Sequence, residues 1–191
     1  MSAAAAPFLV LTGERGVGKS HVCSALRDLA AARGVRCGGF LTRRDLDESG
    51  GTSGLSLEEV ATAARHRLGA TGEDLGGPRV GPFSMDDTIV ALGIRLVRAS
   101  LAARVDLVII DEIGPLELTQ GLGFAPLIPL IAQHPRSAVV VVARPSLVDA
   151  LRWRCAARVS RVETVTCANR DSLPPLLWAQ LWATSPPDTP V

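Results

Sequence analysis

Eight residues close to the N-terminus, Gly13–Ser20, read Gly-Glu-Arg-Gly-Val-Gly-Lys-Ser and fit the pattern G-x-x-x-x-G-K-[ST] at every fixed position. Glycines let the backbone wrap closely, so that successive N–H groups can cradle phosphate oxygens. Lys19 is expected to reach the β- and γ-phosphates, and Ser20 to offer its hydroxyl to Mg²⁺. The loop therefore predicts a site for the phosphates of a nucleoside triphosphate, with Mg²⁺ as the cofactor.

The segments that flank this loop supply the structural context that the motif requires. Phe8–Leu11 is a short apolar run that suits a strand buried on both faces of a sheet. From Gly18 onward, apolar residues recur at helical spacing, and Gly34 stands where a left-handed C-terminal cap is expected. The positive end of this helix would lie beneath the phosphates.

A second chemical feature is the pair Asp111-Glu112, which follows the four aliphatic residues Leu107–Ile110. Ligands of open α/β sheets bind beyond the carboxyl ends of the strands, so both acids are expected to face the phosphate loop. We predict that Asp111 holds Mg²⁺ together with Ser20, and that Glu112 orients or deprotonates the attacking water. The alternative is that these acids only cap the turn after the strand.

Hydrolysis also needs positive charge on the transition state, from an arginine in cis or from a partner. Arg144 is the best candidate in cis because it closes the apolar run Ala138–Ala143, and Arg152 and Arg154 are weaker candidates. Asn169 and Arg170 follow the last predicted strand, where they would contact the nucleobase or else cap the final helix. The predicted catalytic residues are Lys19, Glu112 and Arg144. The predicted metal ligands are Ser20 and Asp111. The predicted nucleotide-binding residues are Gly13, Glu14, Arg15, Gly16, Val17, Gly18, Lys19, Ser20, His21, Asp111, Glu112, Ile113, Gly114, Asn169 and Arg170.

Some of these residues have simpler alternatives. Arg15 could face solvent, and His21 could only begin the helix, since exposed charged groups are usually solvated. The three tryptophans are expected in the core rather than stacked on a base. They are Trp153, Trp178 and Trp182.

Strand and helix patterns alternate along the chain, which predicts an α/β fold with a doubly wound, mostly parallel sheet and helices on both faces. The remaining expected strands are Val35–Thr42 and a last one near Val159–Val165, and Asp45–Gly54 is expected to be an exposed loop. A long helix is expected over Ile89–Leu101, with Ser84 as its N-cap and an acid, Asp87, three residues later. Periodicity leaves residues 54–71 open between a helix and a hairpin.

Size and composition set further limits. We expect one domain over residues 1–184, followed by a tail, Ser185–Val191, that is too rich in proline to pack and is expected to be disordered. The 20 basic and 19 acidic residues nearly balance, which gives no strong signal for nucleic acid or an anionic membrane. No stretch has the roughly 20 apolar residues of a membrane span, and four dispersed cysteines suggest reduced, mostly buried thiols. A reducing compartment such as the cytoplasm is expected.

With these residues in place, the chain resembles the small stand-alone nucleoside triphosphatases known from thermophiles, which have a human relative. The matching pieces are Gly13–Ser20, Gly39–Thr42, Gly81–Phe83, Ile110–Leu118 and Asn169–Asp171. The resemblance implies a RecA-like P-loop fold, Mg²⁺-dependent hydrolysis with broad tolerance of the base, and a hairpin in residues 54–71.

The chain also departs from this family. Arg43 and Arg44 stand where members usually carry acidic residues, and Arg15 replaces a common proline. Two other functions are alternatives: a P-loop kinase of a small acceptor, and a nucleotide-dependent switch or assembly factor. Protein partners and the oligomeric state do not follow from the sequence.

Overall fold

The computed structural model of the protein describes residues 5–155 and 158–182. The predicted tail lies outside these residues, as does the domain boundary at residue 184. The strands are β1 (Phe8–Thr12), β2 (Cys37–Leu46), β3 (Thr52–Glu59), β4 (Arg65–Thr71), β5 (Arg79–Val80), β6 (Phe83–Met85), β7 (Leu107–Ile113), β8 (Ala138–Ala143) and β9 (Arg161–Thr164). The helices are α1 (Lys19–Ala31), α2 (Asp87–Ala102), α3 (Pro115–Thr119), α4 (Leu127–Gln133), α5 (Val148–Cys155) and α6 (Leu173–Leu181), with a 3₁₀ turn at Pro145–Leu147.

All described strands join one sheet in the order β5-β6-β4-β3-β2-β7-β8-β1-β9. The five strands from β2 to β9 are parallel, and every residue of β1 and β8 is buried. Continuous apolar runs produce such strands because both of their faces need a covering layer. Strand β8 lies between β1 and β7, so the phosphate loop and the acidic pair follow strands that are not adjacent.

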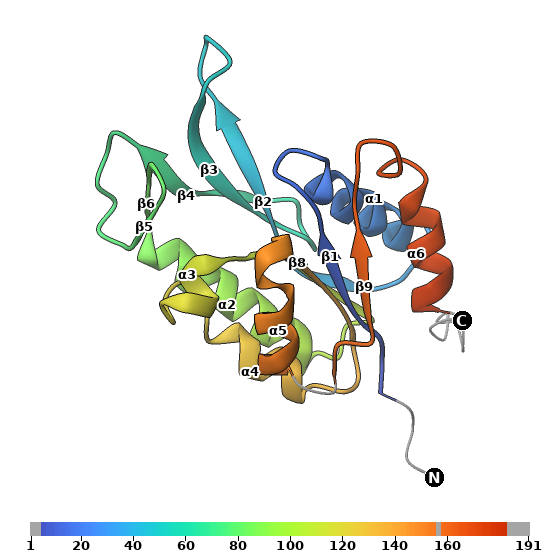
Figure 1. Ribbon diagram of the computed structural model, residues 1–191. Coiled ribbons are helices and arrows are strands. Elements are labelled where there is room, and N and C mark those ends of the chain that lie inside the picture. The colour runs from blue at the N-terminus through green and yellow to red at the C-terminus, as the bar shows by residue number, and fades with distance from the viewer. Residues whose placement is uncertain (1–4, 156–157, 183–191) are drawn as a thin grey trace.

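Helices cover both faces of this parallel core (Figure 1). On one face, α1 and α6 pack on a cluster that contains Leu9 and Leu11 of β1. On the other face, α2, α4 and α5 pack on a cluster that contains Phe8 and Val10. The predicted doubly wound α/β architecture is confirmed. No helix in the described parts of the chain is long and apolar enough to cross a membrane.

Residues 54–71 form a hairpin, which settles the alternative that periodicity left open. β3 and β4 are antiparallel, with Leu57 opposite His66, and the chain turns through Ala61–Ala64. Ala63 adopts a positive φ of 59° in this turn. β3 also pairs with β2 at the edge of the parallel core. This pairing satisfies N–H and C=O groups of β2 that a helix over residues 54–71 would leave without a partner strand.

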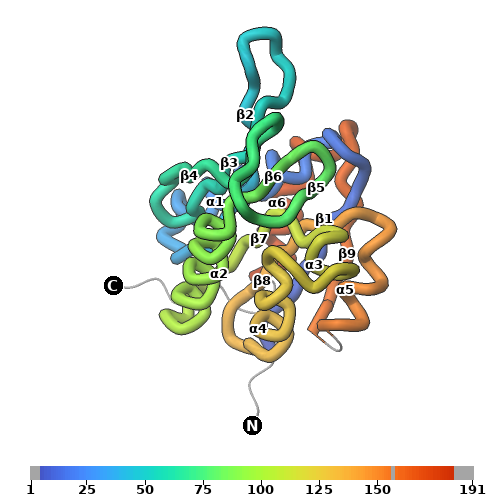
Figure 2. Tube along the Cα trace, turned by 90° about the vertical axis from the view of Figure 1, so that its left-hand side faces the viewer, coloured from blue at the N-terminus to red at the C-terminus, as the bar shows by residue number. Residues whose placement is uncertain are grey.

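The predicted turn or loop over Asp45–Gly54 is wrong at both of its ends. β2 continues to Leu46 and β3 begins at Thr52, so the turn between them holds only residues 47–51. The arm that these strands form stands out from the body of the molecule (Figures 1 and 2). Its polar composition suggested a loop, but backbone pairing such as Arg44 opposite Leu55 extends the strands regardless of side chain.

The N-cap of α2 is Asp86 rather than Ser84. The Asp86 carboxylate accepts hydrogen bonds from the backbone N–H groups of Thr88 (2.8 Å) and Ile89 (3.4 Å). Ser84 belongs to β6 and donates its hydroxyl to the Asp74 carboxylate at 3.0 Å. The predicted start of the helix is confirmed, with the cap displaced by two residues.

The four cysteines are free thiols. Cys23 and Cys155 are buried and Cys37 is half-buried, whereas Cys167 is exposed. Burial raises the pKa of the Cys23 thiol well above its usual range, which keeps that thiol protonated and unreactive. The reducing compartment expected from the sequence stays a prediction.

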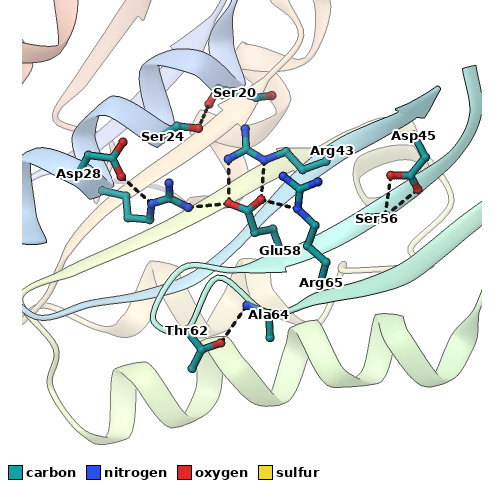
Figure 3. Close-up of polar contacts among 11 residues, drawn as sticks. Ser20, Ser24, Asp28, Arg43, Asp45, Ser56, Glu58, Thr62, Ala64 and Arg65 are labelled. Atoms are coloured by element: carbon teal, nitrogen blue, oxygen red, sulfur yellow. Dashed lines mark hydrogen bonds and ion pairs between the residues drawn. The ribbon is translucent and has the colours of Figure 1, made fainter. Parts of the chain in front are cut away.

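Three arginines surround one buried carboxylate, Glu58 of β3, on the face of the sheet that α1 covers (Figure 3). Arg27 of α1 donates to it at 2.5 Å, Arg43 of β2 at 2.8 and 3.0 Å, and Arg65 of β4 at 2.9 Å. Hydrogen bonds from Arg43, followed by those from Arg27 and Arg65, lower the pKa of Glu58 to about 2. This group, the Glu58 cluster, ties α1 to three strands.

We expect the variant Glu58→Gln to be less stable than wild type by about 3 kcal/mol at pH 7, the free energy that corresponds to lowering the carboxyl pKa from 4.5 to about 2. A depressed pKa stabilises the fold above the unfolded value of 4.5 and loses that contribution as the pH falls through the folded value. The difference between variant and wild type should therefore shrink between pH 5 and pH 2. Urea unfolding at pH 7 and pH 3 measures it.

Glu48 lies exposed in the turn between β2 and β3, so Glu48→Gln is the matched control and should change stability by less than about 0.5 kcal/mol. A Glu58→Gln difference that stays constant from pH 7 to pH 3 would show that the carboxylate charge does not stabilise the fold.

Candidate active site

The phosphate loop lies at the carboxyl end of β1, and its backbone adopts conformations that glycine permits. Gly13, Gly16 and Gly18 have φ angles of 140°, 85° and 107°. A Cβ on Gly13 would lie 2.3 Å from the carbonyl oxygen of Val165, so the loop can pack on the end of β9 only with glycine at this position. Helix α1 starts at Lys19, directly after the loop, and directs its positive end toward it.

Lys19 is 9% exposed, and its ammonium group lies across the loop. The Nζ atom donates hydrogen bonds to the backbone oxygens of Gly13 (2.7 Å) and Glu14 (2.8 Å). These bonds hold the cation at the centre of the loop, where phosphate oxygens can take the place of the carbonyl partners. Glu14 and Arg15 are exposed at the outer side of the loop.

The loop that follows β9 packs against the phosphate loop. A Cβ on Gly18 would lie 2.8 Å from Cδ of Arg170, so the Arg170 side chain rests on the phosphate loop. His21 pairs with Asp171 at 3.0 Å, and both side chains are largely exposed. The structure thus brings Arg170 beside the predicted phosphate site, and it pairs His21 with Asp171 on the surface.

Asn169 closes its own loop. Its Nδ2 donates to the Thr164 carbonyl at 2.9 Å, and its Oδ1 accepts from the Thr166 N–H at 2.8 Å. The predicted alternative, a side chain that caps α6, does not occur, because the cap residue of that helix is Ser172 and makes no side-chain cap bond. Asn169 therefore shapes the segment that carries Arg170.

Asp111 is the buried acid of the site, with 2% of its surface exposed. Burial raises the pKa of its carboxyl to about 6, although the Ser20 hydroxyl and the Thr42 backbone act in the opposite direction. Its Oδ2 has no hydrogen-bond partner among the described residues, and the Thr42 hydroxyl donates to its backbone oxygen. An unpaired carboxylate oxygen beside a serine hydroxyl at the start of a phosphate-loop helix has the chemistry of a Mg²⁺ ligand pair.

No group of three or more His, Cys, Asp or Glu side chains converges within the described segments to hold a metal by itself. Ser20 and Asp111 supply two oxygens, and Mg²⁺ characteristically completes its shell with water and substrate phosphates. The residues present therefore fit Mg²⁺ bound together with a nucleotide.

Glu112 and Arg144 form an ion pair across β7 and β8. Arg144 Nε donates to Glu112 Oε1 at 3.1 Å, and the side chains are 52% and 33% exposed, respectively. Glu112 lies near the carboxyl end of β7 and Arg144 directly follows the adjacent strand β8, so the sheet order explains why two residues that are 32 positions apart meet. The predicted base and the predicted transition-state arginine are thus neighbours.

Ile113 and Gly114, the two residues that follow Asp111-Glu112 in the sequence, have structural roles. The Ile113 side chain is fully buried in the core on the α2 side, and the contact of this residue with a nucleotide stays a prediction. The Gly114 N–H donates to Glu117 Oε2 at 2.8 Å. The Phe124 N–H donates to the other oxygen of Glu117 at 3.2 Å.

Glu117 is a residue whose role the sequence did not disclose. It is 5% exposed, and burial raises its pKa above the ordinary value. By accepting from both ends of the segment 114–124, it fixes the chain that leaves the Asp111-Glu112 pair. The signal was present as a carboxylate at the third position of a helix that begins with Pro115, a capping arrangement.

The tryptophan prediction is partly wrong. Trp153 of α5 is 81% exposed, whereas Trp178 and Trp182 are partly buried and lie 5.6 Å apart by ring centroids. Neighbouring Arg154 donates to the Leu118 carbonyl at 3.1 Å and connects α5 to the end of α3. Helix α5 turns Leu151 and Cys155 to the core, which leaves Trp153 on its outer side.

The fold and the phosphate loop together define a P-loop protein that binds nucleoside triphosphates. The model of a family described as "NTPase" matches residues 8–177. The chain therefore belongs to this NTPase family.

Two relatives align with this chain over more than nine tenths of their own length. A nucleoside-triphosphatase THEP1 of Thermofilum pendens is 31% identical over 175 residues, which cover 91% of this chain and 94% of the relative. Another, of Methanosarcina acetivorans, is 33% identical over 170 residues, 87% of this chain and 91% of the relative.

Two solved structures share the fold. The crystal structure of THEP1 from Aquifex aeolicus superposes with a TM-score of 0.70 at 22% identity and covers 91% of this chain and 98% of its own. The solution structure of a human cancer-related nucleoside triphosphatase gives a TM-score of 0.74 at 24% identity, with 95% of this chain and all of that chain covered. The expected P-loop fold and the expected family are confirmed.

Proposed function

We propose that the chain hydrolyses nucleoside triphosphates to the diphosphate and phosphate, that the reaction requires Mg²⁺, and that several bases are accepted. Family membership supports the hydrolase activity itself. The observation that supports the Mg²⁺ requirement is the buried, unpaired Asp111 oxygen beside Ser20, at the same sheet edge as Lys19 and Glu112.

Binding begins at the phosphate loop. The loop N–H groups and the start of α1 would receive the phosphate oxygens, and Lys19 would exchange its carbonyl partners for oxygens of the β- and γ-phosphates. Ser20 and Asp111 would hold Mg²⁺, which when bound neutralises charge on the β- and γ-phosphate oxygens. A buried ammonium group lacks full solvation, so the exchange places a strong donor against the anion.

The carboxylate of Glu112 would orient the attacking water and accept its proton. The water oxygen bonds to the γ-phosphorus, and the bond from that phosphorus to the β–γ bridging oxygen breaks. Its electron pair leaves with the diphosphate. In this proposal Arg144 turns from Glu112 toward the γ-phosphate, and its half-exposed side chain gives it that freedom.

Tolerance of the base follows from the loop after β9. Asn169 uses its amide oxygen and one amide N–H within its own loop, so this loop, and not a base, fixes the orientation of the side chain. Arg170 lies with its side chain against the phosphate loop, from where its guanidinium plane would stack on the face of a base, a contact that every base offers.

Phosphate release from ATP, GTP, CTP and UTP tests the proposal. We expect release from all four with Mg²⁺, at rates within about tenfold of one another, because stacking on Arg170 does not depend on which base is bound. Chelation of Mg²⁺ by EDTA should reduce every rate to background. No release above background from any triphosphate with Mg²⁺ would leave the chain as a nucleotide switch or a kinase that requires an acceptor.

A further inference from the structure

The Glu58 cluster carries more positive than negative charge. Three guanidinium groups share one carboxylate that is 4% exposed, and the second acidic neighbour, Asp28, contacts only Arg27 and lies largely in solvent. Removal of the only partner of a buried carboxylate would strongly destabilise the fold, because the charge would be left uncompensated. Glu58 keeps Arg27 and Arg65 if Arg43 leaves, so the exchange of Arg43 to another anion does not strand a buried charge.

Strand register places Arg43 beyond the cluster that it contacts. Leu41, not Arg43, is opposite Glu58 in the β2–β3 pairing, so Arg43 starts two residues further along β2 and its guanidinium folds back to reach Glu58. Two residues of a strand correspond to about 6.6 Å. An extended Arg43 would therefore point past the cluster, toward the carboxyl edge of the sheet.

That edge holds the phosphate site, and Arg43 projects from the correct face to reach it. Phe40 is opposite Ile110 in the parallel pairing of β2 with β7. The next residue of β2, Leu41, and the preceding residue of β7, Ile109, both point to the opposite face and belong to the hydrophobic core that α1 covers. Since side chains alternate along a strand, Arg43 and Asp111 project to that same face. The Arg43 charge acts on the Asp111 carboxylate, and the Thr42 hydroxyl binds the Asp111 backbone.

We propose that Arg43 is a catalytic residue that exchanges Glu58 for the terminal phosphate of bound nucleoside triphosphate, across the site from Arg144. This inference rests on the proposed hydrolase function. A guanidinium group can donate two parallel hydrogen bonds to phosphate as it does to a carboxylate, so the Glu58 carboxylate occupies Arg43 until the phosphate arrives. Arg43 then senses the γ-phosphate and stabilises charge on it during transfer to water.

Three substitutions separate this role from a structural one. Arg43→Gln should lower kcat about 10- to 100-fold and reduce the preference for a non-hydrolysable triphosphate over the diphosphate by a similar factor, because one charge-assisted contact to the γ-phosphate is lost. Arg43→Lys should restore part of both. Arg65→Gln removes a different guanidinium from the same carboxylate, and Arg44→Gln removes the exposed neighbour on the opposite face. Both controls should stay within about twofold of wild type, since neither side chain reaches the phosphate site.

The diphosphate serves as the internal reference, since its affinity should be the same in wild type and Arg43→Gln. If Arg43→Gln fails to fold, the wild-type protein still tests the idea through the ¹⁵Nε resonance of Arg43, assigned with Arg43→Lys. That resonance should shift on addition of Mg²⁺ and the non-hydrolysable triphosphate, and not with Mg²⁺ and the diphosphate. An unmoved resonance, or an Arg43→Gln variant with wild-type kcat and wild-type preference for the triphosphate, overturns the inference. Absence of hydrolysis by wild type would instead reject the proposed function.

Discussion

The variant Glu112→Gln should bind nucleoside triphosphate with nearly wild-type affinity and hydrolyse it about 10²- to 10⁴-fold more slowly, the range expected when a general base is removed. Glu112 follows Asp111 at the edge of the sheet, and its side chain is 33% exposed, so water can reach its carboxylate. Glutamine keeps the shape and can accept a hydrogen bond, but it cannot take the proton of the attacking water. Affinity by calorimetry and kcat by phosphate release measure the two effects separately.

Two controls distinguish loss of the base from loss of an ion pair. Glu73→Gln breaks a pair with Arg67 on the far, antiparallel side of the sheet and should leave kcat unchanged. Arg144→Gln breaks the Glu112 pair and preserves the carboxylate, so it should retain more activity than Glu112→Gln. Hydrolysis by Glu112→Gln within threefold of wild type would remove Glu112 as the base. Unchanged triphosphate affinity and kcat in Arg144→Gln would remove Arg144 from the phosphate site.

The parallel core was predictable because its strands are buried on both faces. β1 and β8 consist of apolar residues without polar alternation, a pattern that few other structures produce. The phosphate loop was predictable because each fixed position of its motif is required by the space that the backbone leaves or by the charge of the phosphates. Gly13 is one such position, since a Cβ there would lie 2.3 Å from the Val165 carbonyl oxygen.

The arm formed by β2 and β3 was not predictable from side chains. Its outer residues, among them Asp45 and Leu46, are polar or exposed, so no hydrophobic period marks them as strand. What extends these strands is the backbone pairing of each to the other, which begins on the buried segment around Phe40 and continues outward. Local composition does not encode a partner strand.

Contacts between distant residues depend on the order of strands, which the sequence did not provide. Arg27, Arg43 and Arg65 meet at Glu58 because α1, β2, β3 and β4 are neighbours in the fold. In the same way, Arg144 was predicted near the phosphates, but its pairing with Glu112 required β7 and β8 to be adjacent. The positions were visible in the sequence, and their partners were not.

The variant Lys19→Ala should bind nucleoside triphosphate at least about 100-fold more weakly than wild type. Two charge-assisted hydrogen bonds of about 1.5–3 kcal/mol each are lost, and each 1.4 kcal/mol is a factor of ten in affinity. The fold should persist, because the partners of Lys19 are backbone oxygens at the edge of the loop rather than core groups. Calorimetric titration with a non-hydrolysable triphosphate measures the loss, and thermal unfolding checks the fold.

Lys19 is also the only lysine in the chain, which permits a test on the unmodified protein. An amine-acylating reagent can modify only this side chain and the terminal amine, and mass spectrometry separates the two products. If the ammonium group binds phosphate, Mg²⁺ with triphosphate should slow acylation of Lys19 by more than about tenfold and leave the terminal amine unaffected. Equal acylation with and without nucleotide would contradict a direct contact, even if Lys19→Ala binds poorly, because the defect would then lie in the shape of the loop.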